Sequence, residues 1–148
     1  MSAPALDDHL CFALYSASRA MTAAYRPLLG DLGLTYPQYL VLLVVRDDGP
    51  VSVSHIGERL QLDSGTLSPL LKRMESAGIL SRRRSADDER QVDVTLTDAG
   101  RRIAARAECI PEKLFPATGL TIEQMTELRE AITALTQTLV NPHREETS

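Results

Sequence analysis

The sequence has few of the features that build disulfide frameworks, metal sites or membrane spans. It holds two cysteines, too few for a framework, and three histidines, His9, His55 and His143, without metal-ligand spacing. The longest apolar run, YLVLLVV, is too short to cross a bilayer. The start, MSAPALDDHL, lacks the basic and apolar regions of a signal peptide. We therefore expect a cytoplasmic protein without membrane contact, cofactor or metal.

The rest of the composition is that of an ordinary globular domain. Hydrophobic residues make up 43% and charged residues 24% of the chain, which are average values. No internal repeat and no shift in composition separates a second domain, so we expect one domain over residues 1–148. A net charge of −4 argues mildly against nucleic-acid binding, but such binding depends on a local basic patch.

Helical patterns dominate the chain. Apolar residues recur at helical spacing from Leu10 to Leu28, and Pro27 is expected to kink or end that helix. Residues of the Ser, Thr and Asp type, which cap helix N-termini, precede the later apolar stretches. The candidate caps are Thr35, Ser52 or Ser54, Asp63 or Ser64, Thr97 and Thr121. The helix that starts after Thr97 is expected to run through RAECIPEKLF.

The period changes after Gly78. Val92, Val94 and Leu96 alternate with polar residues, which predicts a strand, and the turn SADDER separates it from LSRRR. The result is a two-stranded hairpin that follows two short helices. Helix, helix and hairpin over about 51–97 predict a winged helix-turn-helix inside a mainly α fold.

The expected reading head has the chemistry for DNA. Small and hydroxylic side chains in the first turn of its second helix can approach bases and phosphates closely, and an arginine at a wing tip can enter a narrow minor groove. The candidate DNA-binding residues are Ser64, Thr66, Ser68, Lys72, Arg73, Arg84 and Arg90, with Asp88 or Asp87 pairing with Arg90. Alternatively, RRR is a solvated strand face, but its place beside a helix-turn-helix favours nucleic acid.

One face of the first helix is unusually polar. Cys11, Tyr15, Ser18, Thr22 and Tyr25 form a single stripe. A helix rises ~1.5 Å per residue, so the two ends of this stripe lie roughly 20 Å apart and cannot touch within one straight helix. A shared site needs either a second subunit or a chain that folds back. Antiparallel pairing about a two-fold axis would bring Cys11 of one chain to Tyr25 of the other, where Tyr36 could join.

Two stretches carry a family resemblance. LDSGTLSPLLKRMESAGIL and the following DDERQVDVTLTDAG resemble the MarR family of winged-helix regulators. That resemblance implies a homodimer on a pseudo-palindromic operator in double-stranded DNA. It also implies that helices at about 6–34 and 98–140 form the dimer interface.

A narrower resemblance covers the first helix and the turn after it. LCFALYSASRAMT and LGLTYPQYLVLL are similar to the organic hydroperoxide-sensing MarR repressors, the OhrR group. The resemblance implies that Cys11 reacts with peroxide, that Tyr25 and Tyr36 of the other subunit bond to its thiolate, and that Tyr15 lines the pocket. Cys109 is then either a resolving cysteine or simply a packed residue. Without a resolving cysteine, a small cellular thiol would cap Cys11.

The predicted function is that of a repressor rather than an enzyme. Oxidation of Cys11 by an organic hydroperoxide would release operator DNA and derepress a peroxide-resistance gene. One alternative is a MarR-type regulator released by a small phenolic ligand in the dimer interface, with Cys11 incidental. The other is a thiol peroxidase, which the sequence disfavours because no histidine lies near Cys11 and no Thr/Pro/Arg peroxidase signature is present.

Overall fold

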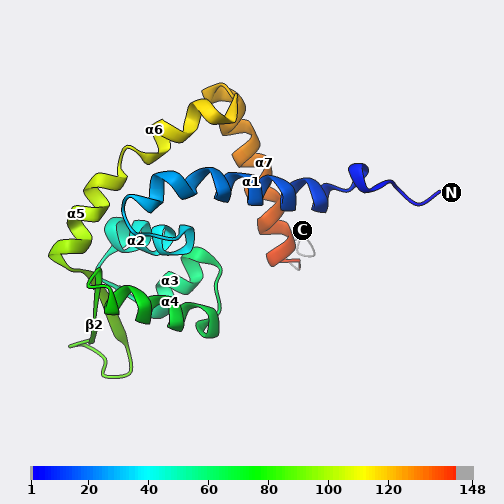
Figure 1. The fold of residues 1–148 in the computed structure, drawn as a ribbon. Coiled ribbons are helices and arrows are strands. Elements are labelled where there is room, and N and C mark those ends of the chain that lie inside the picture. Colours follow the sequence, from blue (N-terminus) through cyan, green and yellow to red (C-terminus); the bar gives the residue numbers. More distant parts are fainter. Residues whose placement is uncertain (1, 143–148) are drawn as a thin grey trace. The chain divides into compact units, whose positions relative to one another are not determined.

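The computed structural model describes residues 2–142 and shows a mainly helical chain with one small sheet (Figure 1). The predicted fold class is confirmed. In chain order the elements are η1 Leu6–Asp8, α1 Leu10–Gly30, α2 Tyr36–Asp48, β1 Val51–Ser52, α3 Val53–Leu60, α4 Ser64–Ser76, β2 Leu80–Arg84, β3 Val92–Leu96, α5 Asp98–Ala107, α6 Ile110–Leu114, η2 Phe115–Thr118 and α7 Ile122–Val140. The chain forms two compact units, Met1–Ile110 and Pro111–Ser148. His143 lies outside the described residues.

Helix starts follow the predicted caps. Thr35 and Gln38 form a reciprocal capping box at the start of α2, and the Asp63 carboxylate accepts the Thr66 amide at 2.7 Å at the start of α4. Thr97 caps α5 by accepting the Gly100 amide. Each such side chain satisfies a backbone donor that the first helical turn leaves open, so local chemistry alone places these boundaries.

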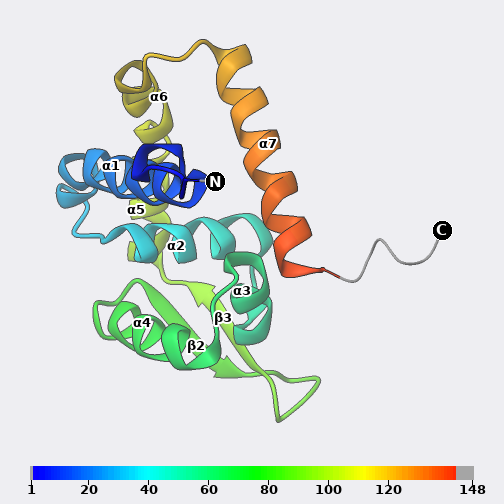
Figure 2. The same ribbon diagram turned by 90° about the vertical axis from the view of Figure 1, so that its right-hand side faces the viewer.

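Helix α2 is the centre of the first unit. Its side chains Tyr39, Val41, Leu42, Val44 and Val45 are buried. The helices and strands around it supply the rest of the core, chiefly Leu29, Ile56, Leu67, Leu71, Met74, Leu80, Val94 and Ala104. In Figure 2, α2 lies between α1 and the group formed by α3, α4 and the sheet. Any displacement of α2 is therefore felt by both the first helix and the helix-turn-helix.

Pro27 does not end the first helix, which was one of the two outcomes, a kink or an end, that the sequence predicted. Helix α1 continues to Gly30 with Pro27 inside its last turn. Proline removes one donor, so only the carbonyl four residues earlier loses its helical partner. That carbonyl belongs to Ala23, an exposed residue, so water can take the place of the missing donor.

The wing is a three-stranded sheet rather than the predicted two-stranded hairpin. Strand β1 pairs with β3, so the antiparallel order is β1-β3-β2, with Val51 opposite Val94 and Arg82 also opposite Val94. A two-residue strand is too short to show any alternation, and for that reason the sequence pattern missed it.

The single long helix predicted after Thr97 is also wrong. Helix α5 stops at Ala107, and α6 starts afresh at Ile110. Pro111 explains the break, because it has no amide to donate to the carbonyl of Ala107 and disfavours helical geometry in the residue before it. Cys109 therefore lies in the turn between two helices.

The second unit, as far as it is described, centres on α7. A capping box of Thr121 and Gln124 starts this helix. Much of its apolar surface is exposed within one chain: Ile122, Met125, Leu128, Ile132, Leu139 and Val140. Among the residues that the structure describes, no helix is both long and apolar enough to cross a membrane.

Candidate functional site

Helix α4 presents the predicted polar face to solvent. Ser64, Thr66 and Ser68 in its first turns are exposed, and Lys72 and Arg73 continue the exposed surface along the helix. The opposite face buries Leu67, Leu70, Leu71 and Met74. The hydrogen bonds from the Thr66 backbone and side chain are the main cause that holds the pKa of the Asp63 carboxyl below its usual range. The helix is thus anchored on its apolar side and presents the side chains of its N-terminal turns to solvent.

The wing carries Arg84 and Arg90, both exposed. The Asp88 carboxylate accepts the backbone amide of Arg90 at 3.0 Å, and Gln91 donates to the Asp88 carbonyl at 3.0 Å. Within residues 2–142 no ion pair joins the Arg90 guanidinium to Asp87 or Asp88, so the expected side-chain pair is not formed. Asp88 instead shapes the tight turn and leaves the Arg90 head available to an external phosphate or groove.

Sequence reasoning missed how Arg82 is used. Its Nε donates to Glu75 Oε2 at 3.1 Å, which joins strand β2 to the end of α4. Hydrogen bonding from Arg82 is also the main cause that lowers the pKa of the Glu75 carboxyl. Helix and wing are thus held in one relative orientation. In the sequence, only two opposite charges seven positions apart pointed to this ion pair, and such a spacing is too common to identify one.

A groove of about 700 Å³ separates the helix-turn-helix from the wing. Its lining includes hydroxyls of Ser54, Ser64 and Ser68 on the helices and Arg82 and Arg90 on the wing side, together with Glu58 and several apolar side chains. The hydroxyl and guanidinium groups can donate hydrogen bonds to phosphate oxygens, whereas the Glu58 carboxylate cannot.

The structure confirms that the polar stripe of α1 cannot close on itself. Cys11 and Tyr25 lie on one uninterrupted helix, fourteen positions and about 21 Å apart. Cys11 is an exposed free thiol, and Tyr15 beside it is exposed with the Arg19 guanidinium 5.5 Å from its ring centre. Within one chain, therefore, Tyr15 shares the neighbourhood of Cys11 and Tyr25 does not.

Tyr25 and Tyr36 do come together, and they are joined by Tyr39, which sequence reasoning did not single out. The ring centres of Tyr25 and Tyr36 are 4.9 Å apart, and Tyr39 lies 5.8 Å from Tyr25 and 6.3 Å from Tyr36. Burial is the main cause that raises the pKa of each phenol, and for Tyr25 the neighbouring phenols add to it. The cluster thus stays neutral, and its hydroxyls stay hydrogen-bond donors. The i, i+3 spacing of Tyr36 and Tyr39 on a helix was the available signal.

The second cysteine is also exposed and free. Cys109 follows the last turn of α5, and its Sγ lies 3.5 Å from the carbonyl of Arg106. It is accessible to a partner thiol, as a resolving cysteine must be, and it is not packed as a core residue would be.

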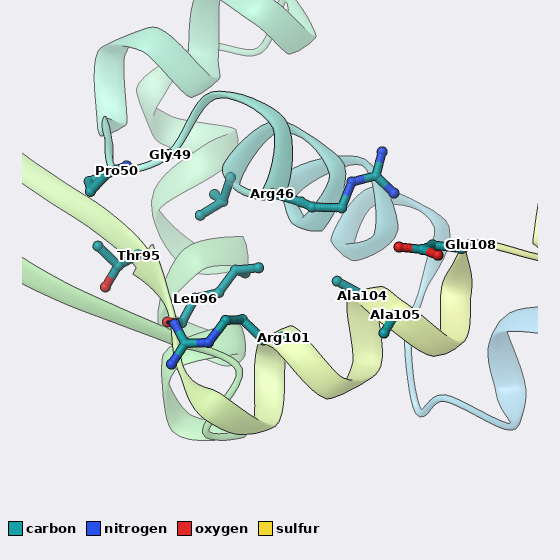
Figure 3. Close-up of a pocket in the computed structure, with 10 residues that line it drawn as sticks. Arg46, Gly49, Pro50, Thr95, Leu96, Arg101, Ala104, Ala105 and Glu108 are labelled. Carbon is teal, nitrogen blue, oxygen red and sulfur yellow. Dashed lines mark hydrogen bonds between the residues drawn. The ribbon is translucent and has the colours of Figure 1, made fainter.

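A pocket of about 450 Å³ lies between the end of α2, β3 and α5 (Figure 3). Val45, Leu96 and Ala104 give it an apolar floor. Arg46 and Glu108 face each other at one end, and Arg101 lies beside Leu96 at the other. Such a space suits a small amphipathic molecule in size and lining.

An exposed helix face of hydroxyls and basic residues, held against an arginine-bearing wing, defines a winged-helix transcriptional regulator that binds DNA. Comparison with known proteins identifies its family. Residues 23–106 match the family model of the transcriptional regulators SarA/Rot. The organic hydroperoxide resistance transcriptional regulator of Bacillus subtilis is 44% identical over 90% of this chain and 91% of its own. The chain belongs to the MarR family, and within it to the organic hydroperoxide-resistance group, OhrR.

Two other relatives agree. The transcriptional regulator TtmR of Methylorubrum extorquens is 48% identical over 88% of this chain and 67% of its own. Reduced AbfR of Staphylococcus epidermidis, solved bound to DNA, is 35% identical with a TM-score of 0.73, over 91% of this chain and 94% of its own. Overoxidized AbfR has also been solved bound to DNA.

Proposed function

We propose that this regulator is a homodimeric repressor that senses organic hydroperoxides through Cys11. The observation that carries the proposal is the division of one helical stripe into two incomplete halves. An exposed thiol stands at one end of α1 and a cluster of neutral phenols stands about 21 Å away at the other. Two copies in antiparallel contact would complete two sites.

The exposed apolar surfaces support a dimer. Leu6, Leu10, Phe12 and Met21 near the chain start, and the apolar residues of α7 described above, are exposed within a single chain. Apolar faces of this extent on two terminal helices are typical of an interface. The apolar side chains beside Cys11 also suit an alkyl hydroperoxide better than hydrogen peroxide.

The chemistry needs a thiolate and hydrogen-bond donors. In the proposed site the Cys11 sulfur attacks the terminal peroxide oxygen, the O–O bond breaks, and the alkoxide leaves and takes up a proton as the alcohol. The sulfur becomes a sulfenic acid. Phenol hydroxyls of Tyr25 and Tyr36 from the other subunit would stabilise the thiolate first and the departing alkoxide next, because their raised pKa values keep them protonated. Tyr15 would line the same pocket.

We assign release of DNA to the next step. A second thiol, from Cys109 or a small cellular thiol, condenses with the sulfenic acid to form a disulfide and water. AbfR has been solved on DNA in both reduced and overoxidized forms, which favours a disulfide over mere oxygen addition as the releasing event. The disulfide would displace the tyrosines of the other subunit. It would thereby alter the spacing of the two DNA-reading heads, the winged helix-turn-helix regions that carry Thr66 and Arg90.

The proposal is tested with a duplex selected from a random library on the reduced protein. Its affinity is measured by fluorescence anisotropy before and after cumene hydroperoxide with a small thiol. We expect a loss of affinity in the wild type and none in Cys11→Ser. Cys109→Ser is the matched thiol control, and intact mass spectrometry then separates a Cys11–Cys109 disulfide from a mixed disulfide. Unchanged affinity of the oxidised wild type would contradict the proposal.

The pocket between α2, β3 and α5 supports a form of the second candidate function, release by a small phenolic ligand, in which the ligand binds within one chain rather than in the dimer interface. In that case salicylate would release the duplex from Cys11→Ser as well as from the wild type. Filling the pocket with Ala105→Leu, a substitution at an exposed position of α5, would abolish this response.

A further inference from the structure

A carboxylate at the end of α2 joins this helix directly to the helix-turn-helix. Asp48 Oδ2 lies 2.8 Å from His55 Nε2 and accepts a hydrogen bond from Arg59 Nε at 2.9 Å. His55 and Arg59 are one turn apart on α3, so they present their donors from the same face of that helix. These hydrogen bonds, that of His55 first, hold the pKa of the Asp48 carboxyl below its usual range.

The tie spans the turn between α2 and α3. Helix α2 ends at Asp48 and is capped by Gly49, where a Cβ would collide with the carbonyl oxygen of Val45. The chain then leaves the helix direction through Pro50 and β1 before α3 begins. Figure 2 shows the end of α2 directly beside α3. Asp48 is therefore a second connection between the two helices, independent of the backbone of the turn.

The other end of α2 carries the phenol cluster. Tyr36 and Tyr39 lie twelve and nine positions before Asp48 on one continuous helix, so about 18 Å separates the first of them from the carboxylate. Val41, Leu42 and Val45 are buried between them, which makes the helix a rigid body in a packed core. A displacement of the α2 end that carries Tyr36 and Tyr39 therefore also displaces Asp48.

Beyond α3 the connection to the reading helix is short and tight. The Leu62 amide donates to the Gly57 carbonyl at 2.9 Å, and a Cβ on Gly57 would lie 3.0 Å from the Leu62 carbonyl oxygen. Helices α3 and α4 are thus packed closely through a turn with little freedom. A reorientation of α3 carries the exposed residues around Thr66 with it.

We propose that Asp48 is a positioning residue that couples the tyrosine end of α2 to the DNA-reading head. The inference rests on the proposed function, because it assigns the path by which a change at the phenols reaches α4. In the reduced protein the tie to His55 and Arg59 holds the head in its binding orientation. After oxidation, displacement of α2 moves the same tie and turns the head away.

The test compares operator affinity in the reduced and oxidised states, using the selected duplex and titrations corrected for the active fraction. We expect Asp48→Ala to weaken binding by the reduced protein about three- to tenfold, as two exposed charged hydrogen bonds would. Binding by the oxidised protein should change little, so the ratio of the oxidised to the reduced dissociation constant shrinks. Asp48→Glu should restore most of the ratio, and Arg59→Ala should give part of the loss.

Asp47→Ala is the matched control. It removes the same charge one position away, where the carboxylate pairs with Arg46 on its own helix rather than with α3. Three results would overturn the coupling role alone. They are a wild-type ratio of dissociation constants in Asp48→Ala, an equal loss of affinity in its reduced and oxidised states, or the same changes in Asp47→Ala. A wild-type ratio of one would overturn the proposed function and the coupling role with it.

Discussion

The DNA-reading head and the sensing end of this chain differ in how complete they are. The head is finished within one chain, where Asp63 caps the reading helix, Glu75 fixes the wing and Asp88 shapes the wing turn. The proposed sensing end is not complete within one chain, because Cys11 and Tyr25 occupy opposite ends of the same helix. A site that is complete within one chain does not depend on a partner copy, whereas a site divided between two copies would respond to how those copies are arranged.

In the proposed dimer, this difference would place control where the two copies meet. The head needs no signal to adopt its shape, so regulation must alter the distance or angle between two finished heads. A two-state dimer requires only a few kcal/mol of differential stabilisation to change operator occupancy substantially. The redox chemistry proposed for the shared site would supply such a difference without changing any residue of the DNA-reading head.

The largest effect is expected when the proposed dimer is broken. Leu128 on α7 is 51% exposed in the single chain, so Leu128→Asp should leave each chain folded but disfavour an apolar interface. We expect the sedimentation mass to halve and operator affinity to fall about 100-fold or more, because two linked half-sites become independent. Circular dichroism checks that helicity is retained, and Glu127→Ala is the control on the same helix. A monomeric wild type would contradict the divided site altogether.

The two regions also differ in how far the sequence predicts them. The head follows from local signals: Asp63 and Thr97 cap helices at the expected positions, and the alternation around Val94 places a strand. The local signals miss two tertiary features, the β1 pairing and the link from Glu75 to Arg82, because these depend on segments that only the folded chain brings together. The end of α5 at Ala107 is a local feature, and Pro111 in the sequence was the available signal for it.

At the sensing end, simple geometry predicts what is missing. Helix rise separates Cys11 from Tyr25, and the continuous α1 confirms that separation. Tyr39 was not predicted as part of the cluster, because in sequence it lies in the apolar run YLVLLVV, which indicates an ordinary core residue, and its 3% exposure in the structure is that of one. Only the packed structure shows its ring beside the other two.

The next largest effect separates sensing from reading. Tyr25→Phe and Tyr36→Phe keep the ring packing but remove a donor to the thiolate. Each should slow the reaction of Cys11 with cumene hydroperoxide by roughly tenfold. That factor corresponds to the loss of one hydrogen bond to a charged group, about 1.5 kcal/mol. Stopped-flow detection of thiol loss measures the rate, and anisotropy should show unchanged affinity of the reduced protein for DNA. An equal loss of DNA affinity would mean that these phenols serve the head as well.

The converse variant acts on the head alone. Arg90→Ala at the wing tip should weaken operator binding by about tenfold and lower the slope of log affinity against log salt by about one. The rate of Cys11 oxidation should be unchanged. Arg102→Ala on the exposed side of α5 is the matched control for loss of one positive charge. A wild-type salt slope in Arg90→Ala would remove the wing tip from the interface.

The smallest effect concerns the acid sensitivity of the finished head. The pKa values of Asp48, Asp63 and Glu75 are all held below their usual range, for Asp48 and Glu75 by hydrogen bonds from side chains on α3 and β2, and for Asp63 mainly by the Thr66 amide. A depressed folded-state pKa contributes stability that is present above the unfolded-state pKa, about 4, and is lost as pH falls through the folded value. Urea unfolding should therefore show falling stability below about pH 4 in the wild type. In Glu75→Gln the fall should be slightly smaller, while Glu127→Gln on α7 should match the wild type. An identical acid profile in all three proteins would show that the link between α4 and the wing does not stabilise the head.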